Sequence, residues 1–98
     1  MSDATLTLTL DGPEEATQLF GTRDQHLRLV RDALTVRLIA RGDTMVIEGT
    51  EEKVSQADRA FQQLRQMLRQ QGKLSQEDVR TVLEIVQESG ERASSPRT

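Results

Sequence analysis

The residues with the clearest chemical potential in this sequence form one short segment, Phe20-Gly21-Thr22-Arg23-Asp24-Gln25. Gly21 lies between two stretches with helical spacing, and a glycine there lets another molecule approach the backbone closely. The N–H groups that begin the second helix attract anions, and Arg23 and Arg28 add positive charge nearby. The segment therefore predicts a phosphate-binding turn, unless Gly21 and Thr22 serve only to end one helix and begin the next.

The charge around this turn differs from that of the whole chain. The 98 residues carry a net charge of −3, which does not fit a protein that binds nucleic acid over its whole surface. Between Gly21 and Gly42, however, five arginines stand against two aspartates, a net charge of +3. Such a segment steers an anionic partner to one face. The alternative is that these arginines only keep a helix and a strand soluble.

Catalytic and metal-binding chemistry finds little support in the sequence. The chain has one histidine, His26, without a second histidine at helical spacing, and it has no cysteine. It contains no acidic cluster with the spacing of a calcium loop, no nucleophile elbow and no GxxxxGK[ST] phosphate loop. We therefore predict no catalytic residue, no metal site and no enzymatic activity in this chain, and we expect His26 on a helix surface.

Three segments that alternate between apolar and other residues predict the strands around this turn. The first, residues 5–10, buries its leucine face, Leu6, Leu8 and Leu10. Residues 35–41 and 44–49 form a hairpin around Gly42-Asp43, with Met45 and Ile47 pointing inward. In the first strand of that hairpin the two faces are Val36, Leu38 and Ala40 on one side, and Arg37, Ile39 and Arg41 on the other.

Helical spacing and end signals predict four helices. Pro13 suits the first turn of a helix that ends at Gly21. Thr22-Arg23-Asp24-Gln25 matches a capping box, so a second helix should begin at once and bury its Leu27, Val30 and Leu34 face. Thr50 caps a long helix that ends at Gly72, and Ser75-Gln76-Glu77-Asp78 is a further capping box before the last helix.

The predicted order is β-α-α-β-β-α with one extra helix, an α+β fold with helices packed on one face of a three-stranded sheet. Residues 1–88 form this domain. Residues 89–98 are polar and without period, and are predicted to be a flexible linker or tail. No apolar run approaches the ~20 residues of a membrane span, the start of the chain has no signal-peptide pattern, and the lack of cysteine fits a cytoplasmic location.

Read together, these features resemble a KH domain, in which a glycine-bearing turn joins two helices and a strand ending in apolar-x-Gly precedes the closing helix. The chain is more similar still to the N-terminal domain of PhoH-like (phosphate starvation-inducible) proteins. Over residues 5–88 it has, in the order of that family, an LFG-x-x-D segment, an RG hairpin and a G-x-x-E-x-V helix entry. These are Leu19-Phe20-Gly21-Thr22-Arg23-Asp24, Arg41-Gly42 and Gly49-Thr50-Glu51-Glu52-Lys53-Val54.

The resemblance implies a bacterial, cytoplasmic protein whose C-terminal part is a P-loop ATPase linked to RNA metabolism, with the tail from Ser89 leading toward it. ATP and Mg²⁺ would bind that other domain, and no cofactor is expected here. Single-stranded RNA would lie along the Gly21 turn, with weak and salt-dependent affinity because few cations are present. The residues expected to contact it are Gly21, Thr22, Arg23, Gln25, Arg28, Arg31, Arg37, Ile39 and Arg41.

One departure from the KH pattern leaves a second hypothesis open. The clamp of a KH domain is Gly-x-x-Gly, whereas Asp24 stands in this chain at the second glycine, as is usual in the PhoH-like pattern. An aspartate adds a side chain and a negative charge where a phosphate would lie. The alternative is a protein-interaction module, which forms homo-oligomers or binds an RNA-processing partner through the acidic remainder or the last helix.

Overall fold

The structure, a computed structural model, describes the backbone of residues 3–94 and the side chains of residues 3–88. The elements follow the predicted order, with one short 3₁₀ turn, η1, added between the first two helices. They are β1 (Asp3–Thr9), α1 (Pro13–Phe20), η1 (Thr22–Asp24), α2 (Gln25–Leu34), β2 (Arg37–Arg41), β3 (Thr44–Thr50), α3 (Glu51–Gln71) and α4 (Gln76–Ser94). The predicted α+β fold with a three-stranded sheet is therefore confirmed.

The three strands form an antiparallel sheet in the order β1-β3-β2, which makes β1 and β2 the edge strands. The predicted hairpin between β2 and β3 is confirmed, because Arg41 pairs with Thr44 across a two-residue turn. Gly42 opens that turn with a φ of 60°, the positive value that a type II′ turn requires at this position. Met45 and Ile47 on the central strand are fully buried, as their spacing predicts.

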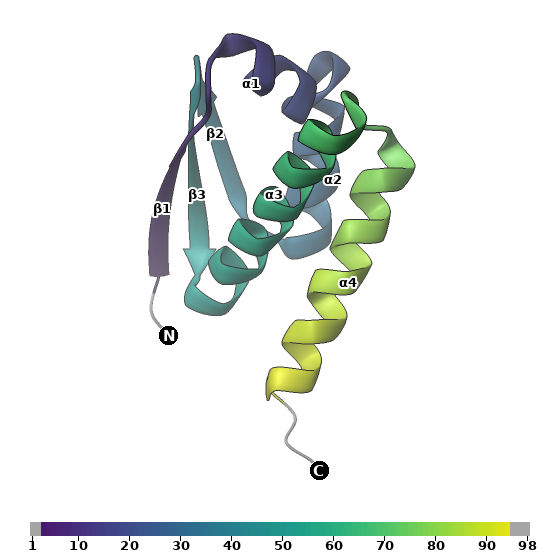
Figure 1. Cartoon of the computed structure of the whole chain (residues 1–98). Coiled ribbons are helices and arrows are strands. Elements are labelled where there is room, and N and C mark those ends of the chain that lie inside the picture. Colours follow the sequence, from purple (N-terminus) through teal and green to yellow (C-terminus); the bar gives the residue numbers. More distant parts are fainter. Residues whose placement is uncertain (1–2, 95–98) are drawn as a thin grey trace.

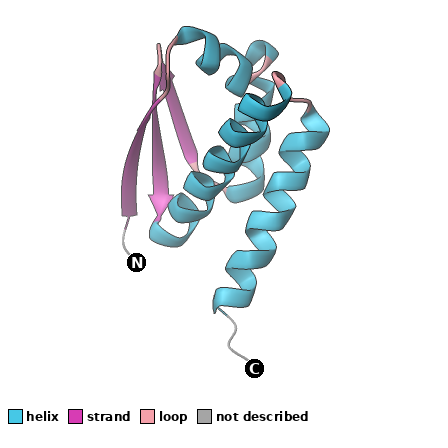
Figure 2. Ribbon diagram, in the orientation of Figure 1, coloured by secondary structure: helices cyan, strands magenta, loops and turns pink. Residues whose placement is uncertain are grey.

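The helices lie on one side of the sheet in two layers (Figure 1). Helices α2 and α3 cover the face that carries the leucines of β1, because α3 contacts both β1 and β3 while α2 contacts β2. Helix α1 lies at one end of the sheet and packs against α2 and α3. Helix α4 packs against α2 and α3 on the side away from the sheet. No helix in the described residues covers the opposite face, here called the open face of the sheet (Figure 2). The core is aliphatic apart from two buried aromatic rings, Phe20 and Phe61.

Helix α4 begins at a capping box, as the sequence predicts. The Ser75 hydroxyl accepts a hydrogen bond from the Asp78 N–H at 3.2 Å, and the Asp78 carboxylate accepts one from the Ser75 N–H at 3.1 Å. Gln71 donates to the same carboxylate oxygen at 3.3 Å. These bonds fix the turn between α3 and α4, which lies next to the Gly21 turn described below.

The cap makes stability depend on pH in a defined direction. The hydrogen bond from the Ser75 backbone N–H holds the pKa of the Asp78 carboxyl below its ordinary value of 3.8. A lowered folded-state pKa stabilises the fold fully above the unfolded value, and this contribution is lost as the pH falls below 3.8. We expect Asp78→Asn to lose less thermal stability than the parent chain over this acidic range. Melting curves followed by circular dichroism would reveal it, and parallel pH profiles would contradict the assignment.

The end of α4 differs from the expectation for the tail. The helix continues through Ser94, six residues beyond the predicted end of the domain at Glu88. Once a helix exists, each further residue adds one backbone hydrogen bond at little cost, so polar residues without an apolar stripe can extend it. The remaining predicted linker, residues 95–98, lies outside the described residues.

Candidate nucleic-acid interface

The turn between α1 and α2, here called the Gly21 turn (residues 20–25), is more strongly bent than a capping box allows. Gly21 has a φ of 82° and a ψ of 174°, and Arg23 and Asp24 both have positive φ, 54° and 60°. The Asp24 N–H donates to the Gly21 carbonyl oxygen at 3.2 Å. No side chain caps α2, which begins at Gln25 rather than directly after Thr22. The capping-box prediction at Thr22 was therefore wrong, because two successive left-handed residues turn the backbone out of the helical path.

His26 is buried, so its expected place on a helix surface was also wrong. Its side chain is 5% exposed, and its Nδ1 atom lies 3.0 Å from the Leu19 carbonyl oxygen. Because a carbonyl oxygen only accepts, Nδ1 must donate and therefore carries a proton. The ring packs against Gly21 so closely that a Cβ there would lie 2.9 Å from the His26 Cγ atom. His26 thus joins the end of α1 to the start of α2, and leaves no room for a side chain at position 21.

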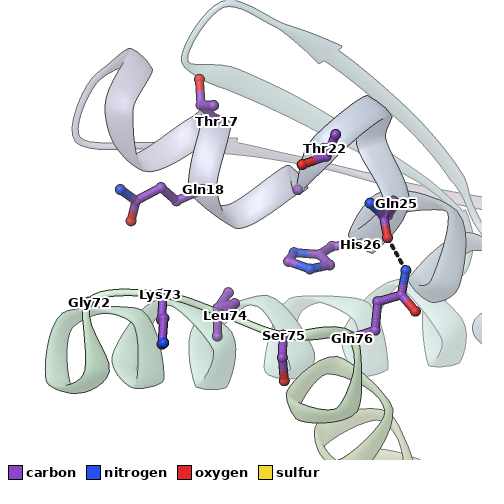
Figure 3. Close-up of a pocket in the computed structure, with 11 residues that line it drawn as sticks. Thr17, Gln18, Thr22, Gln25, His26, Gly72, Lys73, Leu74, Ser75 and Gln76 are labelled. Carbon is purple, nitrogen blue, oxygen red and sulfur yellow. Dashed lines mark hydrogen bonds between the residues drawn. The ribbon is translucent and has the colours of Figure 1, made fainter.

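The Gly21 turn faces the α3–α4 connection across an open hollow with a volume of about 490 Å³ (Figure 3). Thr17, Gln18, Thr22, Gln25 and His26 line one side, and residues 72–76 line the other. The Gln76 amide donates to the Gln25 side-chain oxygen, and this bond closes one end of the hollow. The lining residues are glutamines, threonines, a serine, glycines, a leucine, a histidine and Lys73, whose side-chain nitrogen points away from the Gly21 turn in Figure 3. The lining therefore contains no carboxylate, although the chain as a whole is acidic.

The structure places the predicted contact residues in three groups. Gly21, Thr22 and Gln25 belong to the hollow. Three exposed arginines form the second group: Arg23 on η1, and Arg28 and Arg31 one turn apart on α2. The Arg31 guanidinium lies 3.1 Å from the Asp32 carboxylate, which offsets part of its charge. Arg23 and Arg28 are then the cations best placed beside the Gly21 turn.

The third group, Arg37, Ile39 and Arg41, lies elsewhere. Leu38 on the same strand packs against the core, and neighbouring strand residues point to opposite faces. The three residues therefore point to the open face, where Arg37 lies 3.9 Å from the Glu48 carboxylate and Ile39 pairs with Val46. The structure does not bring them together with the Gly21 turn. A ligand that contacts both surfaces has to pass around the edge of β2.

Of the eleven residues that line the hollow, only Gly21, Thr22 and Gln25 were predicted as contact residues. His26 was assigned to the surface, and residues 72–76 were not assigned to the site, because nothing local in the sequence shows that the α3–α4 connection returns to the Gly21 turn. Among residues 3–88, whose side chains the structure describes, no group of three or more histidine, cysteine or acidic side chains is arranged to hold a metal ion. In the same part of the chain, no helix is both long and apolar enough to cross a membrane.

Comparison with known proteins first defines the class of fold. A solved structure of a protein of unknown function from Aeropyrum pernix superposes with a TM-score of 0.69 at 14% sequence identity. The match covers 96% of this chain and 52% of that protein, and at this identity it establishes the fold alone. The chain matches no protein-family model.

A sequence comparison then points to a particular group of proteins. The chain is 36% identical over 70 residues to a PhoH-like protein of Bacillus subtilis (strain 168). The matched segment is 71% of this chain but spans only 22% of the length of that protein. The similarity supports a PhoH-related domain, in agreement with the resemblance found in the sequence.

Proposed function

We propose that this chain is a KH-like, RNA-binding accessory domain of the kind found at the N-terminus of PhoH-like ATPases. The observation that carries the proposal is the Gly21 turn, which has a left-handed backbone, two exposed arginines beside it and a hollow free of carboxylates behind it. Such a turn suits the phosphodiester backbone of a single strand, because exposed backbone and cations meet at one place. The resemblance to PhoH-like proteins implies that ATP and Mg²⁺ bind a separate domain.

The geometry of Asp24 supports this proposal. A Gly-x-x-Gly turn uses its second glycine because glycine accepts a positive φ at little cost. Asp24 adopts a φ of 60° in that position, and aspartate is among the few other residues that tolerate the left-handed region. Its side chain is exposed, so the carboxylate need not occupy the hollow. Asp24 is thus compatible with a left-handed turn in which a glycine would otherwise stand, and Arg23 and Arg28 offset the added negative charge.

The two arginine groups allow a matched test with amide-detected NMR at low salt. We expect a pool of short single-stranded RNA to shift the amides of residues 21–28, with weak affinity that falls steeply as salt rises. Arg23→Gln with Arg28→Gln removes two cations from the Gly21 turn and should weaken binding roughly ten-fold, with a shallower salt dependence. Arg37→Gln with Arg41→Gln removes the same charge from the open face and serves as the control.

The outcomes separate the hypotheses. If the Arg23 and Arg28 double variant loses binding while the Arg37 and Arg41 control keeps it, the RNA site at the Gly21 turn is supported. Equal losses in both variants would show that only net charge matters. No amide shifts at millimolar RNA would mean that the isolated domain does not bind RNA, and would favour the protein-interaction alternative.

A further inference from the structure

The two edges of the sheet are built differently. Strand β1 is seven residues long and carries one charge, Asp3, and no proline. Strand β2 is five residues long and has an arginine at each end, Arg37 and Arg41. Unpaired edge strands invite pairing with another chain, and proteins block this with charges, proline or a short strand. β2 has two arginines in a short strand, whereas β1 has a single charge, at its first residue, and leaves Ala4 to Thr9 without charge or proline.

The sequence of β1 is compatible with pairing to itself around a two-fold axis. In an antiparallel pair centred on Leu6, opposite residues are Asp3 and Thr9, Ala4 and Leu8, Thr5 and Thr7, and Leu6 with its own copy. Opposite residues point to the same face, so the leucine face continues across the two copies and the threonine face does too. The two Asp3 residues would lie six positions apart along the ribbon, roughly 20 Å, which is beyond the range of strong repulsion in physiological salt.

Antiparallel pairing of two copies around a two-fold axis is unfavourable for β2. Pairing two copies of β2 around Ile39 places Arg37 opposite Arg41 of the second copy, and does so twice. Like charges directly opposite one another destabilise an antiparallel pair. Of the two edges, only β1 is therefore self-complementary in both apolar pattern and charge.

The packing of β1 also favours a second β1 strand at this edge. Ala4 and Leu6 pack against the core from the helix side, yet both remain partly exposed at the edge of the sheet. A second β1 strand would cover this side and place Leu6 against its own copy at the axis. Helix α2 and strand β2 would stay at the outer ends of the assembly, because β2 is the opposite edge of the sheet.

We propose that β1 is the interface of a symmetric dimer, in which two copies of this chain form one six-stranded antiparallel sheet. A two-fold pair is closed, so it uses the free edge of each copy and leaves the protected β2 edges outside. This proposal is independent of RNA binding, since none of the residues of the Gly21 turn takes part.

The test uses sedimentation velocity of the 98-residue chain over a range of concentrations, without RNA. We expect the mass to approach twice the 11.0 kDa monomer as concentration rises. Thr5 and Thr7 are exposed on the open face and would lie opposite each other in the dimer. Thr5→Lys with Thr7→Lys creates two facing Lys–Lys pairs and should weaken association at least about ten-fold. Thr5→Lys with Thr7→Glu changes the same positions, but creates Lys–Glu pairs and should restore association.

Circular dichroism of both variants shows whether each is folded before its mass is interpreted. A monomer at every concentration would overturn the proposal. It would also be overturned by a dimer that responds to neither double variant, because the contact would then use another surface. A mass that depends on the pairing of charges, falling in the first variant and recovering in the second, would establish the β1 interface.

Discussion

Gly21→Ala is expected to destabilise the domain by about 4 kcal/mol, the sum of two separate costs. The backbone of Gly21, with a φ of 82° and a ψ of 174°, lies in a region that is essentially restricted to glycine, at a cost of about 1–3 kcal/mol for alanine. The added Cβ would also lie 2.9–3.0 Å from three atoms of the buried His26 ring. Forcing an extra carbon into packed surroundings costs a further 1–3 kcal/mol or so.

Gly12→Ala provides a matched control for the backbone cost. Gly12 has a φ of 125° and a ψ of 174°, in the same restricted region, but a Cβ there has nothing within 4 Å. We therefore expect Gly12→Ala to cost less than Gly21→Ala, and the difference measures the contact with His26. Urea unfolding of both variants, followed by circular dichroism, gives the two free energies of unfolding. Equal costs would show that His26 moves aside freely.

A double-mutant cycle with His26→Ala tests the same contact from the other side. Removing the imidazole leaves the Leu19 carbonyl oxygen without its buried partner, so the single variant should itself be destabilised by about 1–3 kcal/mol. In that background Gly21→Ala should cost only about as much as Gly12→Ala does. Additive costs would contradict the proposed steric coupling between the two residues.

The regular elements were predictable because their signals are local and repeated. The Thr-Leu alternation of β1, the start of α3 after Thr50 and its end at Gly72, and the hydrogen-bonded cap at Ser75 all agree with the structure. In these segments one face meets the core and the other meets water, so residue spacing alone identifies the buried side. The same holds for Met45 and Ile47 on the central strand.

The Gly21 turn was less predictable because tertiary packing overrides its local signal. Helical spacing predicts one buried face of α2, formed by Leu27, Val30 and Leu34, and the structure confirms it. Helix α4 adds a second contact face to α2: its Gln87 donates to the Ala33 carbonyl oxygen at 2.9 Å, and its first residue, Gln76, donates to the Gln25 side-chain oxygen. His26 is buried in the first turn of α2, the end of that helix that lies next to the start of α4. The fourth helix was predicted, but its position against α2 was not, and only that position places His26 beside the hollow.

Glu15→Gln is expected to destabilise the domain by about 2 kcal/mol, although the side chain lies near the surface of α1. The Glu15 carboxylate lies 3.3 Å from the Arg65 guanidinium of α3, and the two side chains are only 11% and 15% exposed. It also accepts a hydrogen bond from the Asp11 N–H at 2.8 Å. The Arg65 Nε atom is buried without a hydrogen-bond partner in the described structure. Removing the negative charge therefore leaves a poorly hydrated cation with less compensation than before.

Arg69→Gln is the control that separates burial from distance. The Arg69 guanidinium lies 2.9 Å from the Asp11 carboxylate, closer than Arg65 lies to Glu15, but both of these side chains are more than 60% exposed. Water and salt screen an exposed pair, so its loss should cost about 0.5 kcal/mol or less. If urea unfolding gave Arg69→Gln the larger cost, distance rather than burial would determine the strength of these pairs. The opposite order is expected, because the hydrated ions of the exposed pair lose little when they separate, whereas Arg65 has few waters to replace Glu15.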